Sequence, residues 1–200
     1  MKKIIVIPDD YTHASAQLID ENDYPDFQIK TLGDLSQAEN ADAILAQAEA
    51  LILIRERTII DDAFLRRTPN LKLISQTGKV ARNIDIEACT RAGVSIVEGS
   101  GSPIAPAELT WLLIMAAKRR LIQSVKGMQQ GLWQTAIGQT VHGLKLGIIG
   151  YGKIGKRVAQ FAKAFALDVE ILGSERAQKE AQQDGFSIAK SRAEFFQSCD

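Results

Sequence analysis

The segment whose residues most clearly suggest a chemical role is a cluster of glycines. It lies between an apolar stretch and a stretch of helical periodicity. Residues 146–159 contain Gly150, Gly152 and Gly155 in a GxGxxG pattern. Because the pattern follows a predicted strand and opens a predicted helix, backbone N–H groups at the helix start can cradle a pyrophosphate. We therefore expect a dinucleotide site built from Gly150, Tyr151, Gly152, Lys153, Ile154 and Gly155.

The predicted strand 168–172 bears on which dinucleotide binds. In NAD sites an acidic residue about 20 residues after the glycines ends this strand and binds the ribose hydroxyls. Gly173 stands there instead, so no carboxylate repels a 2′-phosphate, and Ser174 and Arg176 could bind one. Glu175 could still serve the ribose, and Arg176 could equally be an ordinary solvated residue. The sequence favours NAD(P), leaning to NADP.

Composition excludes several classes of protein. The 200 residues are 46% hydrophobic, and 24 Lys and Arg balance 24 Asp and Glu, so nucleic-acid and anionic-membrane partners are not expected. The longest apolar tract, residues 109–117, is shorter than the roughly 20 residues of a membrane helix. Cys89 and Cys199 lack metal-ligand spacing, which predicts free thiols, no metal and a cytoplasmic location.

Short β-branched runs alternate with helical stretches, a pattern that predicts an α/β fold with parallel sheets. Predicted strands cover residues 3–7, 27–31, 50–54, 71–75, 94–97, 145–149, 168–172 and 186–189. Predicted helices cover residues 61–67, 86–92, 106–120, 153–166, 175–184 and 192–197. The flexible run 98–103 marks a domain boundary, giving domains 1–101 and 102–200, and residues 127–143 are predicted to form a surface connection.

Five segments resemble, in order and spacing, the D-isomer-specific 2-hydroxyacid dehydrogenases. They are residues 71–85, 92–97, 105–110, 131–133 and 143–155. The resemblance implies a flavodoxin-like substrate domain followed by the first half of a Rossmann NAD(P)-binding domain. It also implies an oxidoreductase that transfers hydride between NAD(P) and a small 2-keto or 2-hydroxy acid, and a homodimer formed through helices of the cofactor domain.

The resemblance also implies roles for individual residues. Residues 77–81, and above all Gly78, Lys79 and Val80, match a loop that holds the substrate carboxylate through backbone N–H groups. Consecutive loop amides form such an anion-binding nest, and Lys79 adds a cation. Arg55 matches the mouth of the cleft and Thr110 lies near the nicotinamide. Ordinary surface roles remain the alternatives for Arg55 and Lys79.

The family's chemistry uses an arginine, a histidine and an acid that are expected to follow Asp200. Neither His13 nor His142 matches the position of the family's histidine, so we predict no catalytic residue here. The chain is therefore expected to be the N-terminal, truncated portion of such an enzyme, inactive by itself. A non-catalytic nucleotide-binding or dimerising module is the alternative, and a marginally folded fragment with an unpaired sheet edge is a third.

Overall fold

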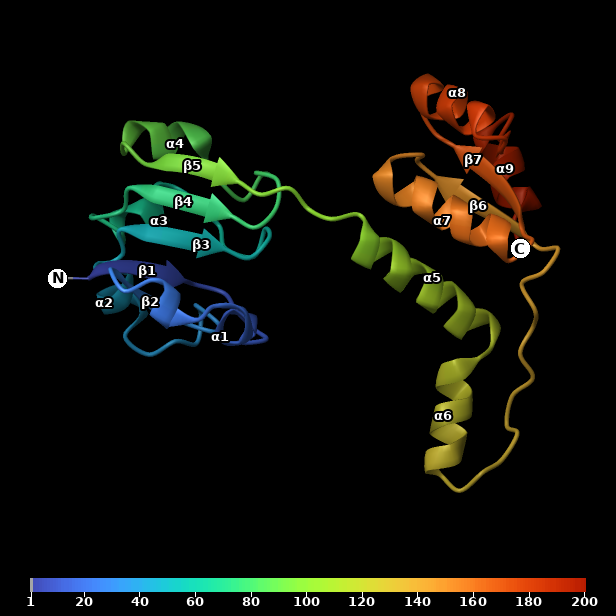
Figure 1. Ribbon diagram of the computed structural model, residues 1–200, viewed down its shortest axis with the longest axis horizontal. Coiled ribbons are helices and arrows are strands. Elements are labelled where there is room, and N and C mark those ends of the chain that lie inside the picture. Colours follow the sequence, from blue (N-terminus) through green and yellow to red (C-terminus); the bar gives the residue numbers. More distant parts are fainter. Residues whose placement is uncertain (1) are drawn as a thin grey trace. The chain divides into compact units, whose positions relative to one another are not determined.

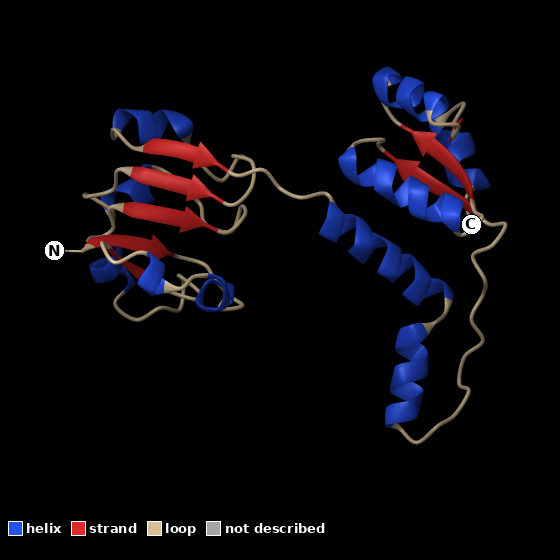
Figure 2. Cartoon of the chain, viewed as in Figure 1, coloured by secondary structure: helices blue, strands red, loops and turns tan. Residues whose placement is uncertain are grey.

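The computed structural model describes residues 2–200, and the chain divides into two compact units, Met1–Gly101 and Ser102–Asp200 (Figure 1). Strands and helices alternate in both units (Figure 2), as an α/β fold requires. Each unit has a sheet and a hydrophobic core of its own.

The first unit is built on a five-stranded parallel sheet. Its strands are β1 (Lys3–Ile7), β2 (Phe27–Thr31), β3 (Ala50–Leu53), β4 (Leu73–Gln76) and β5 (Ser95–Glu98). They lie in the order β2-β1-β3-β4-β5, which is the flavodoxin-like order, so the predicted fold class of this unit is confirmed. The connections carry α1 (Ala14–Leu18), the 3-10 helix η1 (Glu21–Asp23), α2 (Ala41–Leu45), α3 (Asp62–Arg66) and α4 (Ile86–Arg91).

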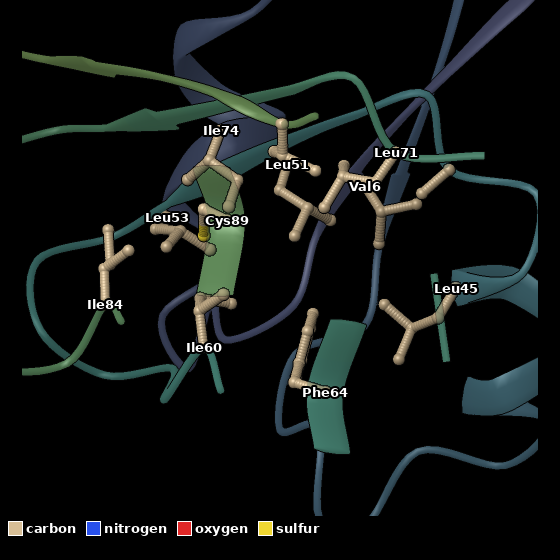
Figure 3. Packing of buried hydrophobic residues seen from close by; sticks show 12 residues of the cluster. Val6, Leu45, Leu51, Leu53, Ile60, Phe64, Leu71, Ile74, Ile84 and Cys89 are labelled. Atoms are coloured by element: carbon tan, nitrogen blue, oxygen red, sulfur yellow. The ribbon is translucent and has the colours of Figure 1, made fainter. Parts of the chain in front are cut away.

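Alternating apolar residues of the central strands form the core of the first unit (Figure 3). Leu51 and Leu53 of β3 and Ile74 of β4 are fully buried. They pack with helix side chains that include Phe64 of α3 and Cys89 of α4. Because alternate strand residues face the same side, this burial fixes the register of the sheet and therefore the position of the loops at its edge.

The second unit is built on a three-stranded parallel sheet. Its strands are β6 (Lys145–Ile149), β7 (Asp168–Leu172) and β8 (Ser187–Ile188), in that order. Its helices are α5 (Ile104–Lys118), α6 (Leu121–Gln129), α7 (Lys153–Ala164), α8 (Glu175–Gln183) and α9 (Arg192–Ser198). Trp111 joins α5 to α7, with its ring centroid 6.2 Å from that of Phe161 and 4.9 Å from that of Phe165. Among residues 2–200, no helix combines the length and apolar character needed to cross a bilayer.

Several features of the chain differ from the sequence prediction, including the short helices α1 and α2, which were not predicted. The strands β4 and β5 extend to Gln76 and Glu98, which pair with each other, so Glu98 belongs to the sheet and not to the predicted flexible run. Helix α6 was not predicted, and Gly127 lies within it although it was expected to open the surface connection. Gly127 is buried because Thr135 of the returning segment packs against it.

Helix α1 is anchored at the carboxyl edge of the first sheet by the buried Asp10. The Asp10 carboxylate accepts hydrogen bonds from the backbone N–H groups of Ala14 (3.0 Å) and Ser15 (2.8 Å), and from the Ser15 hydroxyl (2.7 Å). Burial alone would raise the pKa of this carboxyl, but the three donors outweigh it and hold the pKa of Asp10 below its ordinary value. Asp10 is therefore ionised in the folded protein at neutral pH.

We expect Asp10→Ala to lower the free energy of unfolding by about 1–2 kcal/mol, because it removes these capping bonds. The folded pKa lies below the unfolded one, so the contribution of Asp10 is present at neutral pH and lost as the pH falls through the folded pKa, below about pH 4. Urea unfolding at several pH values should show the difference from the wild type shrinking in acid. The exposed Asp26→Ala is the control, and an equal loss there would contradict the assignment.

Candidate functional site

The glycine turn, residues 150–155, carries the chain from β6 into α7. Gly150 has φ 89°, a left-handed conformation that favours glycine. A Cβ atom on Gly155 would collide with the carbonyl oxygen of Gly150, so only glycine lets the helix lie this close to the strand. A Cβ on Gly152 would meet no atom within 4 Å, and no side chain caps the start of α7. The turn is thus closely packed at Gly155 and open to solvent at Gly152.

A cavity of about 290 Å³ lies beside the glycine turn within the second unit. It brings Thr110 of α5 together with Gly150, Ile154 and Gly155 of the turn. The Thr110 hydroxyl donates to the backbone carbonyl of Pro106 at 2.7 Å, which fixes its orientation. Thr110 and three residues of the glycine motif, two separate parts of the sequence, therefore line one cavity.

Tyr151 faces away from the open side of the glycine turn. Its side chain is buried against Phe186, and its hydroxyl donates to the Asp184 carboxylate at 2.9 Å. Burial, followed by the Asp184 carboxylate, raises the pKa of the Tyr151 phenol. Tyr151 can therefore offer a ligand only its backbone, whereas Lys153 is exposed at the start of α7.

Space is tight where β7 ends. A Cβ on Gly173 would lie 3.0 Å from the Ala177 Cβ and 3.8 Å from the Gly150 Cα, so the strand end lies close to the glycine turn. Ser174 caps α8, its hydroxyl accepting the Ala177 N–H at 3.4 Å, and Glu175 begins the helix.

Arg176 is an exposed cation near this strand end, with 88% of its side chain accessible. Its Nε lies 3.7 Å from an oxygen of Glu180, a carboxylate that also pairs with Lys156 of α7 at 2.7 Å. The Lys156 ammonium lowers the pKa of Glu180. Because Glu180 is engaged mainly by Lys156, the guanidinium of Arg176 is free to reach a ligand.

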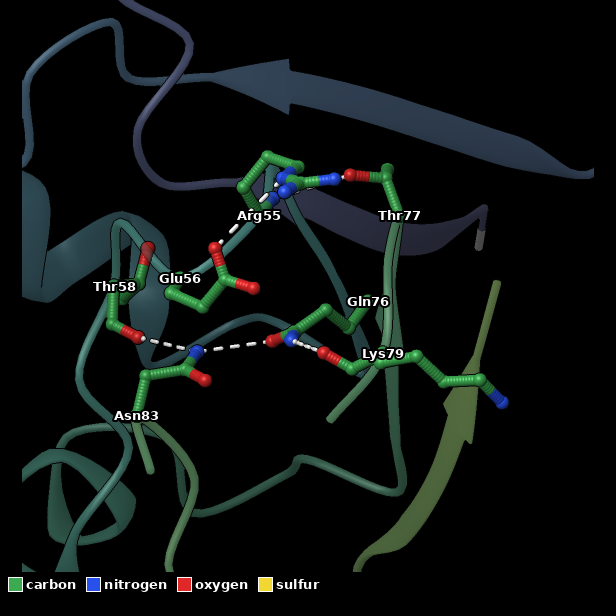
Figure 4. Close-up of polar contacts among 7 residues, drawn as sticks. All are labelled: Arg55, Glu56, Thr58, Gln76, Thr77, Lys79 and Asn83. Atoms are coloured by element: carbon green, nitrogen blue, oxygen red, sulfur yellow. Dashed lines mark hydrogen bonds and ion pairs between the residues drawn. The ribbon is translucent and has the colours of Figure 1, made fainter. Parts of the chain in front are cut away.

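In the first unit, the loop after β4, residues 77–81, lies beside the loop after β3 (Figure 4). Arg55 has φ 59°, and its backbone N–H donates to the Thr77 hydroxyl at 3.1 Å. Its side chain lies over Gly78, because a Cβ there would be 3.5 Å from an Arg55 Nη atom. The structure thus places Arg55 against Thr77 and Gly78, at the start of the loop that also contains Lys79 and Val80.

Two buried amides, which the sequence analysis did not single out, hold the β4 loop in shape. The Gln76 amide nitrogen donates to the Lys79 carbonyl, and the Asn83 amide nitrogen donates to the Gln76 amide oxygen at 2.9 Å (Figure 4). Asn83 also donates to the Thr58 carbonyl at 3.1 Å. With its carbonyl tied inward, Lys79 is fixed within the loop.

Glu98, at the end of β5, was also missed. One of its carboxylate oxygens accepts the Val80 N–H at 2.9 Å, and the other pairs with the Lys79 ammonium. The Lys79 ammonium, and after it the Val80 N–H, hold the pKa of Glu98 below its ordinary value. The predicted strand ended one residue short of Glu98, so its position beside the β4 loop was not recognised.

The histidines lie on exposed positions outside both groups of residues. His13 precedes α1, and His142 precedes β6. Within the part of the chain that the structure describes, no three His, Cys, Asp or Glu side chains form a group able to hold a metal.

Comparison with known proteins gives consistent matches. Residues 111–200 match the model of the D-isomer specific 2-hydroxyacid dehydrogenase NAD binding domain. Glyoxylate reductase of Aeropyrum pernix is 34% identical over 145 residues, which are 68% of this chain and 41% of that protein. D-3-phosphoglycerate dehydrogenase of Bacillus subtilis is 30% identical over 182 residues, 88% of this chain and 33% of that protein. The crystal structure of a phosphoglycerate oxidoreductase from Vibrio cholerae is 41% identical with a TM-score of 0.90, covering 100% of this chain and 65% of that one.

The packing of the glycine turn predicts opposite effects of two similar substitutions. Gly155→Ala should lower the free energy of unfolding by about 2–3 kcal/mol, because its methyl group collides with the Gly150 carbonyl. Gly152→Ala should cost less than about 1 kcal/mol, because its methyl group meets open space. Chemical denaturation of both variants tests this, and equal losses would show that the turn is not packed in this way.

Proposed function

Because the chain belongs to the D-isomer specific 2-hydroxyacid dehydrogenases, we propose that its second unit binds NAD(P) and its first unit binds the carboxylate of a small 2-keto or 2-hydroxy acid. The chain spans 41% of the Aeropyrum pernix relative and 33% of the Bacillus subtilis relative. The dehydrogenase activity of a whole protein is therefore proposed here and not taken over from these relatives. The observation that supports this proposal most strongly is the glycine turn, which is closely packed at Gly155 and open at Gly152.

The residues of the second unit fit a dinucleotide. The uncapped start of α7 directs backbone N–H groups and a partial positive charge to the open side of the turn, where a pyrophosphate would bind. Thr110 and Ile154 line the adjoining cavity and would contact the remainder of the cofactor. The nicotinamide ring of such a cofactor supplies the hydride.

In the first unit, we assign the substrate carboxylate to the β4 loop. The backbone N–H groups of Lys79 and Val80, with the Lys79 ammonium, form an anion-binding nest, and Arg55 supplies a second cation beside Gly78. Neither His13 nor His142 belongs to this group, so residues 1–200 by themselves lack a placed acid or base for the proton transfer, worth typically 10²–10⁴ in rate. We propose that they bind the cofactor without turnover. A cytoplasmic location is also proposed, since Cys89 and Cys199 are free thiols.

We further propose a preference for NADP over NAD. Gly173 leaves no carboxylate at the end of β7, and crowding by Ala177 disfavours one there. Ser174 and the exposed Arg176 directly follow this strand end, and we expect them to bind the 2′-phosphate, because the guanidinium is only weakly engaged by Glu180. Glu175 remains available to the ribose in the NAD-bound form.

Fluorescence titration of residues 1–200 with NADPH and NADH tests the cofactor proposal. We expect binding that is tighter for NADPH, and no reduction of glyoxylate. Gly152→Ala should weaken both cofactors about tenfold or more, because its methyl group enters the space of the pyrophosphate. Arg176→Ala should weaken NADPH about fivefold and leave NADH unchanged.

The matched control for Arg176 is Lys179→Ala, which removes another exposed cation of α8. An equal effect of the two substitutions would show that the preference for NADPH comes from the general positive charge of α8 and not from a specific contact of Arg176. Turnover by residues 1–200 would refute the non-catalytic proposal, and no binding of either cofactor would refute the dinucleotide site.

A second proposed role is formation of a homodimer through the second unit. Helix α6 and the connection after it run outward from α5 in Figure 1. Large apolar side chains remain exposed along residues 109–137, which include part of α5, all of α6 and the start of the connection. They are Leu109, Leu112, Leu113, Leu121, Ile122, Val125, Met128, Leu132, Trp133 and Ile137. Trp133 is 75% and Ile137 90% exposed, and exposed large apolar side chains that lie close together in sequence in this number favour an interaction site. We propose that a second copy of the chain covers it, as the family resemblance implies.

We expect sedimentation velocity to give the mass of a dimer for the wild type. Leu112→Asp should shift it to a monomer, because a carboxylate would be buried without a partner in the interface. Leu18→Asp is the control, since Leu18 is 82% exposed but lies in the first unit. A wild-type monomer at all concentrations, or dissociation caused equally by both substitutions, would contradict the proposed interface.

A further inference from the structure

The donors assigned to the substrate carboxylate are already engaged by a carboxylate of the chain itself. Glu98 accepts the Val80 N–H with one oxygen at 2.9 Å, and its other oxygen pairs with the Lys79 ammonium. One oxygen on a loop amide and one on an ammonium is the arrangement that an incoming carboxylate would adopt on the same two groups. In Figure 4 the Lys79 side chain accordingly extends away from Arg55.

The backbone beneath Glu98 is fixed, but its side chain is free to move. Glu98 pairs with Gln76 across the sheet, and the Gly99 N–H donates to the carbonyls of Gln76 (2.8 Å) and Gly78 (3.1 Å). The side chain of Glu98 is 39% exposed and that of Lys79 is 75% exposed. Rotation of the Glu98 side chain into solvent would therefore free both donors without moving the loop.

We propose that Glu98 is an internal carboxylate that occupies the substrate-carboxylate position on the β4 loop and must leave it when substrate binds. This inference rests on the proposed function of the loop. If Glu98 stayed, two carboxylates would share one ammonium and one loop amide, and the repulsion between them would oppose binding. Arg55 lies next to Gly78 and pairs with Glu56, and the ion pair of Glu98 is with Lys79.

The contact between Glu98 and Lys79 is weak enough for a substrate to displace Glu98. An ion pair exposed to this degree contributes little, so a substrate held by further contacts can replace it. The lowered pKa of Glu98 means that its carboxylate is ionised, and therefore competes, throughout the neutral range. The expected consequence is that Glu98 weakens carboxylate binding by a modest factor.

The test is titration of the full 200-residue chain with glyoxylate, followed through the backbone amide NMR signals of Lys79 and Val80. Glu98→Ala should tighten binding about fivefold, because the competitor is removed. Glu98→Gln should tighten it less, because the neutral amide can still accept the Val80 N–H. Glu49→Gln is the matched control. Glu49 forms a similar pair with Lys72 at 2.7 Å, but at the start of β3 and β4, the edge of the sheet opposite to the β4 loop. Loss of this pair should leave glyoxylate binding unchanged.

The outcomes of this titration separate two claims: that the β4 loop binds the substrate carboxylate, and that Glu98 competes for the same donors. Wild-type and Glu98 variants that bind glyoxylate equally at Lys79 and Val80 would overturn the role of Glu98 while leaving the loop assignment intact. Failure of these amides to respond in any variant would overturn the loop assignment and the competitor together. Should Glu98→Ala fold poorly, the isosteric Glu98→Gln still separates these results, since any gain in its affinity supports the proposal and none opposes it.

Discussion

Parallel strand pairing is the constraint on which the candidate sites depend. In a parallel sheet every strand ends at the same edge, so residues distant in sequence meet there. The register places Leu53, Gln76 and Glu98 in line across β3, β4 and β5. Arg55 and the β4 loop come directly after the ends of β3 and β4, and they therefore lie together with Glu98 although they are far from it in sequence. In the second unit, pairing of β6 with β7 brings the glycine turn beside the end of β7 in the same way.

Register alone does not shape a loop, and in the first unit buried amides complete the arrangement. Gln76 and Asn83 are 1% and 7% exposed, and a buried amide is costly unless it is hydrogen-bonded. Their bonds to each other and to the carbonyls of Lys79 and Thr58 meet most of this requirement. The same bonds remove conformational freedom from the β4 loop. The stability of the core and the shape of the β4 loop are therefore linked through Gln76.

Much of the fold was predictable from local patterns, because a strand or helix is specified largely by its own residues. Strands β1, β2, β6 and β7 have the predicted bounds, and the glycine turn stands where strand and helix signals meet. The functions of Gln76 and Glu98 depend on a neighbouring strand, which local periodicity does not identify. The inward orientation of Tyr151 likewise depends on Asp184, 33 positions later. Helix α6 escaped prediction because Gly127, a residue type that disfavours helix interiors, was interpreted as the start of a surface connection although it lies within the helix.

The two proposed anion-binding regions differ in how their donors are satisfied before a ligand arrives. At the start of α7 no side chain caps the helix, and the Gly152 backbone is open, so the first-turn N–H groups there are left to solvent. At the β4 loop, the Val80 N–H and the Lys79 ammonium are satisfied by Glu98. A ligand at the first region replaces solvent, whereas a ligand at the second replaces a tethered carboxylate whose local concentration is fixed by the sheet. Selectivity at the β4 loop should therefore favour anions that gain further contacts beyond the carboxylate itself, because the carboxylate contacts alone only exchange one partner for another.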